Sequence, residues 1–174
     1  MNGIVLTGYM GAGKSSVAFA LARECGLPLV DTDARISALC GMSISDIFKD
    51  YGEPYFRDRE TRLLKSLKEE GFEGILSTGG GMPLKEENRQ LMKSLGKVFY
   101  LRAKPSTIAK RLSNDSSRPL LAGAADMAEK EKRIADMLAL REEAYESAAD
   151  TVIDTDDLNV HEIVNLISLH KSNI

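Results

Sequence analysis

The chain has 174 residues, with 23 Lys and Arg against 26 Asp and Glu, a formal net charge of −3, and 43% of its residues are hydrophobic. This composition excludes disordered and fibrous proteins, and the length predicts a single domain over residues 1–174. The slight acidic excess argues against a nucleic-acid-binding protein, because such domains usually carry a basic excess. It leaves room for a local pocket of positive charge.

The N-terminal segment shows no sign of export or membrane insertion. Its first charged residue is Lys14, whereas a secretory signal needs a cationic start, and no apolar stretch approaches the ~18 residues of a membrane helix. Cys25 and Cys40 fit neither a disulfide framework nor a metal-ligand spacing, so we expect reduced, buried thiols. The sequence therefore predicts a cytoplasmic protein with no membrane partner.

Short apolar runs and helical patterns alternate along the whole chain. Two of the helical patterns, at about residues 106–112 and 126–148, lie between the fourth and fifth runs, and a final helix follows the fifth. This alternation predicts an α/β fold in which helices flank both faces of a five-stranded parallel sheet. The five predicted strands centre on residues 4–6, 29–30, 75–76, 98–101 and 152–153.

The strongest motif is GYMGAGKS at residues 8–15, which follows the first apolar run and opens a helix. It fits the phosphate-binding pattern G-x-x-x-x-G-K-[ST], whose glycines let successive backbone N–H groups face phosphate oxygens. Lys14 would reach the outer phosphates, and the Ser15 hydroxyl would coordinate Mg²⁺. Neither the [NT]-K-x-D nor the D-x-x-G string of Ras-type GTPases occurs. The motif is therefore consistent with a small kinase or with a regulatory protein that binds a nucleotide.

Two carboxylates, Asp31 and Asp33, follow the second apolar run. The carboxyl ends of parallel strands line the ligand crevice, so both should face the phosphates. Asp31 would hold Mg²⁺ directly or through water, and Asp33 would accept a proton from an attacking hydroxyl. The alternative is that Asp31 or Thr32 only caps the helix that begins there.

Two arginines occupy positions where a helix would present apolar side chains to the core. Arg57 shares a stripe with Glu60, and Arg141 shares one with Tyr145. A buried guanidinium needs an anionic partner, which a structural ion pair such as Arg57–Glu60 could supply. The pair of arginines instead favours an anionic substrate, most simply a carboxylate held by two hydrogen bonds.

Two further segments favour ligand binding. Gly79, Gly80 and Gly81 follow the third apolar run, where they would let a ligand approach the backbone closely. Residues 113–125 carry Arg118-Pro119 in a polar, then small-residue loop, and loops of ~12 residues are commonly lids. Arg118 would then neutralise charge on a transferring phosphoryl group. The alternative for this loop is a tolerated surface insertion.

These features together resemble the shikimate kinase family. The resemblance rests on motifs in the family's order between residues 8 and 145: GYMGAGKSS, the Asp-Thr-Asp at 31–33, Phe56-Arg57 with Glu60, Ser77-Thr78 before three glycines, Arg118-Pro-Leu-Leu, and Leu140-Arg141 with Tyr145.

The resemblance implies a P-loop kinase fold of the nucleoside monophosphate kinase type, with a mobile lid at about 113–125 and a substrate-binding region at about 32–62. It implies transfer of the γ-phosphoryl group of MgATP to the 3-hydroxyl of shikimate, in the chorismate route to aromatic amino acids. We expect a monomer. The rival interpretations are another small-molecule kinase, such as one acting on gluconate, and a non-catalytic nucleotide-binding switch.

Site roles carry over where the motifs match. The implied catalytic residues are Asp33, Lys14 and Arg118. ATP would be bound by Gly11, Ala12, Gly13, Lys14, Ser15, Ser16, Arg118 and Arg111, the last lying against the adenine. Shikimate would be bound by Asp33, Arg57, Gly79, Gly80, Gly81 and Arg141. Mg²⁺ would be held by Ser15 and, through water, by Asp31.

Overall fold

The computed structural model describes residues 3–113 and 126–171 of the chain. Its centre is a five-stranded parallel sheet with the strand order β2-β3-β1-β4-β5. All five apolar runs of the sequence form strands, so the predicted fold is confirmed. The strands are β1 (Ile4–Thr7), β2 (Leu29–Asp31), β3 (Ile75–Ser77), β4 (Lys97–Arg102) and β5 (Thr151–Asp154).

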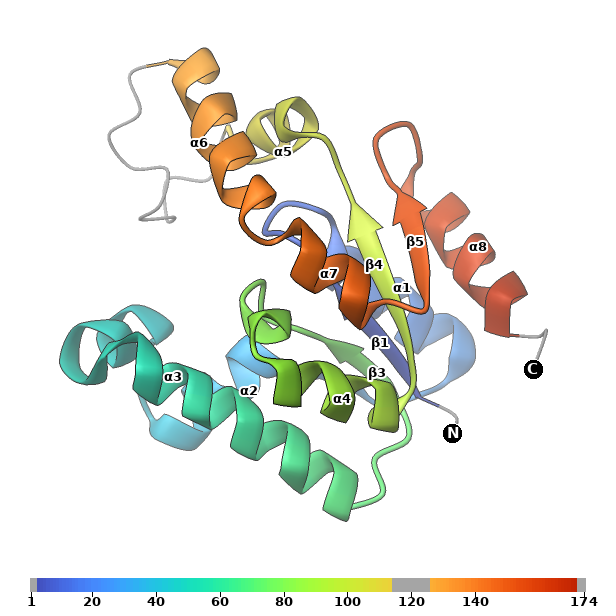
Figure 1. Cartoon of the computed structure of the whole chain (residues 1–174). Helices are drawn as coiled ribbons and strands as arrows, with labels where there is room; N and C mark the ends of the chain where they lie inside the picture. The colour runs from blue at the N-terminus through green and yellow to red at the C-terminus, as the bar shows by residue number, and fades with distance from the viewer. Residues whose placement is uncertain (1–2, 114–125, 172–174) are drawn as a thin grey trace.

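Helices cover both faces of the sheet (Figure 1). On one face lie α1 (Lys14–Cys25) and α8 (Val160–Lys171). The other face is covered by α3 (Ile44–Glu69), α4 (Glu86–Leu95) and α7 (Glu142–Ala148). The remaining helices are α2 (Thr32–Cys40), the single 3₁₀ turn η1 (Met82–Leu84), α5 (Pro105–Arg111) and α6 (Met127–Ala139).

Strand β1 contributes side chains to two of the hydrophobic cores. Successive side chains of a strand point to opposite faces, so Ile4 and Leu6 pack with α1 and α8, while Val5 packs with α3 and α4. Burial on both faces explains why this segment is continuously apolar rather than alternating.

The strand order decides where a ligand can bind. Strand β1 lies between β3 and β4, and because all five strands are parallel, their carboxyl ends lie at one edge of the sheet. Ligands of α/β proteins bind at such an edge. The segments that follow β1, β2 and β3 there are residues 8–15, 31–33 and 79–81, which are the three motifs of the sequence.

The prediction of one long helix at 126–148 is wrong, because this segment forms two helices, α6 and α7. The Arg141 amide donates to the Leu138 carbonyl at 2.9 Å, a tight turn that ends α6, and Arg141 is the N-cap of α7. Neither Gly nor Pro marks this break, so the sequence carries no ordinary stop signal for it. Arg141 therefore lies at a helix end rather than within one helical stripe.

The surface differs from expectation at the cysteines. Cys25 is exposed at the end of α1 and Cys40 is partly exposed, so the prediction of buried thiols is wrong.

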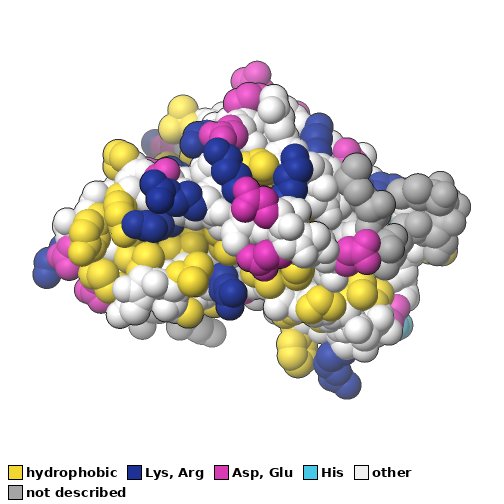
Figure 2. All heavy atoms as spheres, turned by 90° about the horizontal axis from the view of Figure 1, so that it is seen from below, with side chains coloured by type: hydrophobic (Ala, Val, Ile, Leu, Met, Phe, Trp, Pro, Cys, Tyr) yellow, Lys and Arg dark blue, Asp and Glu magenta, His cyan; other side chains and the backbone are white. Residues whose placement is uncertain are grey.

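On the face of the molecule seen from below, acidic and basic side chains are intermixed (Figure 2). Among residues 3–113 and 126–171, no helix has both the length and the apolar character needed to cross a membrane.

Candidate active site

The loop between β1 and α1 has the backbone of a phosphate cradle. Gly8, Gly11 and Gly13 have φ angles of 143°, 77° and 98°, values that side chains rarely permit. Gly13 is the N-cap of α1, so the first amides of that helix face the loop. The structure therefore gives each glycine of the motif the conformational role that the sequence predicted.

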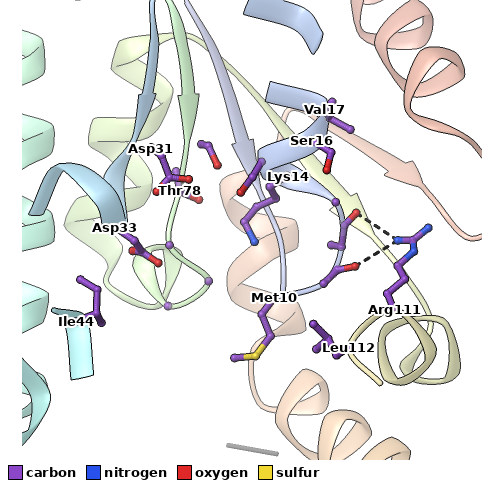
Figure 3. A pocket seen from close by; sticks show the side chains of 18 of the residues that line it. Met10, Lys14, Ser16, Val17, Asp31, Asp33, Ile44, Thr78, Arg111 and Leu112 are labelled. Atoms are coloured by element: carbon purple, nitrogen blue, oxygen red, sulfur yellow. Dashed lines mark hydrogen bonds between the residues drawn. The ribbon is translucent and has the colours of Figure 1, made fainter. Parts of the chain in front are cut away.

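Lys14 lies within the curve of this loop. Its ammonium donates to the carbonyl oxygens of Gly8 at 2.7 Å and of Tyr9 at 3.0 Å. In Figure 3 it lies between Asp31 and Asp33 on one side of the pocket and Arg111 on the other. A phosphate bound in the cradle would thus meet a cation already held at its edge.

Arg111 closes the other side of the cradle. Its guanidinium donates to the backbone carbonyls of Gly11 and Ala12 at 3.4 Å, contacts drawn as dashed lines in Figure 3, and to the Thr155 carbonyl at 2.8 Å. The planar group therefore bridges the loop and the segment after β5. Leu158, with the two residues after it, lines the same pocket.

The segment after β2 combines capping and pocket-lining roles. Asp31 is the N-cap of α2, and its carboxylate accepts from the Ala34 amide at 3.1 Å, so the capping alternative is confirmed for this residue. The Thr32 hydroxyl, fully buried, accepts from the Gly79 amide at 2.8 Å. Asp31 and Asp33 nevertheless both line the pocket. Thr32 therefore fixes the two carboxylates relative to the triple glycine.

Arg57 has the structural ion pair that the sequence left open. Its guanidinium is 2.8 Å from Glu60 and 2.8 Å from Glu53, and both acids lie on α3 with it. The Glu60 side chain is fully buried, whereas that of Glu53 is 57% exposed. Burial raises the pKa of Glu60 to about 7, although the charge of Arg57 opposes the rise. The ion pair that the sequence left open is therefore present for Arg57.

The three glycines after β3 leave room for the protein's own side chains. A Cβ on Gly79 would overlap the Asp33 carboxylate, and one on Gly81 would overlap the Arg57 guanidinium. Gly81 has an ordinary φ of −99°, and the backbone there would accept any residue. A side chain at either position would push Asp33 or Arg57 from its place, so glycine there leaves these two side chains room at the pocket.

Gly80 and Arg141 complete the side of the pocket for which the sequence predicts acceptor binding, the acceptor side. The Tyr145 hydroxyl donates to the Gly80 carbonyl at 2.6 Å, which joins α7 to the glycine segment. Arg141, one helical turn before Tyr145, lines the pocket with its guanidinium carbon 5.9 Å from the centre of the Tyr9 ring. Both arginines predicted from the sequence therefore reach the pocket.

A single cavity of about 1080 Å³ joins the two sides. Every described residue with a predicted role lines it, and Arg118 lies outside the described residues, as does most of the predicted lid. The described lining residues with predicted roles are Gly11, Ala12, Gly13, Lys14, Ser15, Ser16, Asp31, Asp33, Arg57, Gly79, Gly80, Gly81, Arg111 and Arg141.

A divalent cation of the Mg²⁺ type fits the donors at the cradle. Ser15 and Asp31 both line the cavity, and hydroxyl and carboxylate oxygens are the ligands that hard cations prefer. Among the described residues no cluster of three or more His, Cys, Asp or Glu could hold a metal by itself. The donor set therefore suits an ion that keeps water and phosphate oxygens as its other ligands.

Comparison with known proteins agrees with this geometry. A family model described as shikimate kinase matches residues 10–170. The chain belongs to the shikimate kinase family. A shikimate kinase of Enterococcus faecalis is 41% identical over 169 residues, 96% of each chain. A solved shikimate kinase from Acinetobacter baumannii, in complex with shikimate, has a TM-score of 0.88 at 33% identity and covers 99% of this chain and 94% of its own.

A second solved shikimate kinase, from Bacteroides thetaiotaomicron, has a TM-score of 0.89 at 31% identity and covers 98% of both chains.

In the present member of the shikimate kinase family, the cavity is also lined by residues for which the sequence predicted no role in the site. Phe48 and Phe56 of α3 lie on the acceptor side, and Leu158 and Val160 lie on the nucleotide side. All four are apolar, and only Phe56 belongs to a motif of the sequence, beside Arg57, so the fold alone shows that they line the cavity.

Proposed function

We propose that this chain transfers the γ-phosphoryl group of MgATP to the 3-hydroxyl of shikimate, giving ADP and shikimate 3-phosphate. The observation that carries the proposal is the single cavity, in which a phosphate cradle faces one general base candidate, Asp33, and two arginines. A family of ATP-dependent kinases that act on shikimate supplies the substrate class. The monomeric state stays a prediction from the sequence.

At the nucleotide end, the chain binds the phosphates through backbone amides of residues 11–16 and the ammonium of Lys14. Arg111 lies beyond the cradle, where its planar guanidinium would contact the base. Apolar contacts from Leu158 and Val160 favour a flat heterocycle there. The role of Arg118 on a closing lid stays a prediction from the sequence.

At the acceptor end, Arg57 and Arg141 bind the carboxylate of shikimate, because guanidinium groups pair with carboxylates through two parallel hydrogen bonds. Asp33 receives the hydroxyl proton as the acceptor oxygen forms its bond to the γ-phosphorus. The bond from that phosphorus to the bridging oxygen of ADP breaks, and the electron pair leaves with ADP. Positioning and charge neutralisation supply most of the rate, as in other phosphoryl transfers.

Mg²⁺ would be held by the Ser15 hydroxyl and, through water, by the Asp31 carboxylate. When bound, it would neutralise charge on the β- and γ-phosphates. The cap that Asp31 forms on α2 orients its carboxylate without consuming all of its oxygen lone pairs.

The proposal is tested by measuring ADP release with and without shikimate. We expect release that depends on shikimate, and equal release in its absence would contradict the assignment. A panel of acceptors that includes gluconate distinguishes the rival small-molecule kinase. Nucleotide binding by calorimetry without turnover of any acceptor would instead support a non-catalytic switch.

A further inference from the structure

Tyr145 connects the two parts of the acceptor side. Its hydroxyl donates to the Gly80 carbonyl at 2.6 Å, although 65 residues separate the two in sequence. Its ring is completely buried and stacks on the ring of Tyr100, with 5.0 Å between ring centres. The packing of the buried ring therefore fixes the position of the hydroxyl.

The same hydroxyl is linked to Arg141. Burial raises the pKa of Tyr145 to about 12, while the charge of Arg141 and its hydrogen bond to the hydroxyl oppose that rise. At neutral pH the hydroxyl keeps its proton and donates to Gly80, and the cationic Arg141 lies close enough to act on it electrostatically. The Tyr145 amide also donates to the Arg141 carbonyl at 3.0 Å within α7.

The glycine segment is held from its other side by Thr32. The Gly79 amide donates to the Thr32 hydroxyl at 2.8 Å, so residues 79–80 lie between two side-chain anchors on different elements. Asp33 and Arg57 lie against this segment so closely that a Cβ at Gly79 or Gly81 would overlap them. A shift of the segment would therefore displace both side chains.

Resting on the proposed function, we propose that Tyr145 is a positioning residue for the acceptor site: its hydroxyl sets the distance between Arg141 and the glycine segment against which Asp33 and Arg57 lie. Tyr145 does not touch the reacting atoms. It acts through Arg141 and Gly80, so its loss weakens acceptor binding and leaves the nucleotide cradle unchanged.

The test replaces Tyr145 by Phe, which removes the hydroxyl and keeps the stacked ring. We expect the KM for shikimate to rise about tenfold, the size of one lost buried hydrogen bond, with the KM for ATP within about twofold of wild type. Tyr100→Phe is the matched control, because it removes a hydroxyl from the other ring of the stack. Neither ring lines the cavity, and it is the Tyr145 hydroxyl that donates to Gly80. We expect wild-type KM values for it.

A purely structural role for Tyr145 gives a different result. Thermal midpoints would fall while both KM values stayed unchanged, or both would rise together, and either result would overturn the proposal. A double variant with Arg141→Ala adds a second readout. If Tyr145 acts through Arg141, the hydroxyl deletion raises the shikimate KM much less in that background, whereas fully multiplicative effects contradict the link.

If Tyr145→Phe does not fold, the proposal can be tested at Thr32, whose hydroxyl binds the other side of the glycine segment. Thr32→Val removes the hydroxyl that binds the Gly79 amide, and Thr32→Ser restores one. We expect the first to raise the shikimate KM selectively and the second to return it toward wild type. An unchanged shikimate KM in a folded Thr32→Val protein would show that anchoring of this segment does not control acceptor binding. Wild-type turnover is measured first, so failure of the proposed function is seen separately.

Discussion

At the phosphate end of the cavity, Gly13 has a φ of 98° and nothing within 4 Å of the place where a Cβ would stand. At the acceptor end, Gly81 has a φ of −99° and no room for a Cβ beside Arg57. The first glycine is needed for backbone conformation and the second for space. The cradle is thus built by one continuous loop, and the acceptor site by side chains from separate elements that share a crowded volume.

Because of this difference, we expect substitutions at the two ends to affect binding and stability differently. Damage to the cradle changes the course of the backbone and should affect nucleotide binding and folding together. Damage to the acceptor site moves or removes one side chain and should affect acceptor binding while the fold persists. The variants below test that distinction, beginning with the largest expected effect.

Asp33→Asn should lower kcat by about 10³-fold, since a positioned base contributes about 10²–10⁴ in rate. The nucleotide affinity should stay close to wild type because Asp33 belongs to the acceptor end. Initial rates and calorimetric titration with ATP measure the two quantities. A wild-type kcat would remove Asp33 from the reaction.

Arg57→Ala and Arg141→Ala should each raise the KM for shikimate by about 100-fold, the loss of a charge-assisted hydrogen-bonded pair. The KM for ATP should change little. Loss of Arg57 also leaves the buried Glu60 without its cation, so this variant should be the less stable of the two. A change confined to ATP affinity would disprove the carboxylate site.

Gly13→Ala and Gly81→Ala form a matched pair. We expect Gly13→Ala to destabilise the fold by about 1–3 kcal/mol, because alanine must adopt a left-handed φ there. Gly81→Ala should keep wild-type stability and raise the shikimate KM by about tenfold, because its Cβ displaces the Arg57 guanidinium. Urea titrations and steady-state kinetics measure both variants. The reverse pattern would contradict the two roles of glycine.

The pH dependence of stability tests the buried acid of the acceptor end. The folded pKa of Glu60, about 7, lies above its usual 4.5, so the folded protein binds more protons in this window. Stability from Glu60 is then greatest at low pH and falls as pH rises through 7. Relative to Glu60→Gln, wild type should lose about 1–3 kcal/mol between about pH 5 and pH 8. If the stability of wild type and of Glu60→Gln changed with pH in the same way, the pKa of Glu60 would not be raised in the folded protein.

The sequence predicted the sheet and the cradle well because both depend on local patterns. Five apolar runs are enough to define the strands, and the cradle is one uninterrupted motif of residues 8–15. The break between α6 and α7 was missed because the turn at Leu138–Arg141 uses only backbone hydrogen bonds and no turn residue. Local pattern could not reveal it.

The residues predicted for the acceptor site line one cavity, but their arrangement could not be predicted from the sequence. Asp33 was identified from its place after a strand, and Arg57 and Arg141 from charge on helical stripes, yet their contacts with the glycine segment and with neighbouring helices depend on tertiary packing. Nothing in the sequence states that Gly79 makes room for Asp33, or that Tyr145 reaches Gly80. The apolar residues near the nucleotide end, such as Leu158, were missed for the same reason.

The ion pairs of Arg57 have a consequence for selectivity. Its guanidinium pairs with Glu60, which is buried and has a pKa raised to about 7, and with Glu53, which is largely in water. An incoming carboxylate can therefore exchange with Glu53, and the local charge balance stays the same. A neutral analogue has no charge to offer in that exchange and must compete with an acid tethered one helical turn away at high effective concentration. The resident acid thus acts as a built-in competitor that only another anion displaces readily.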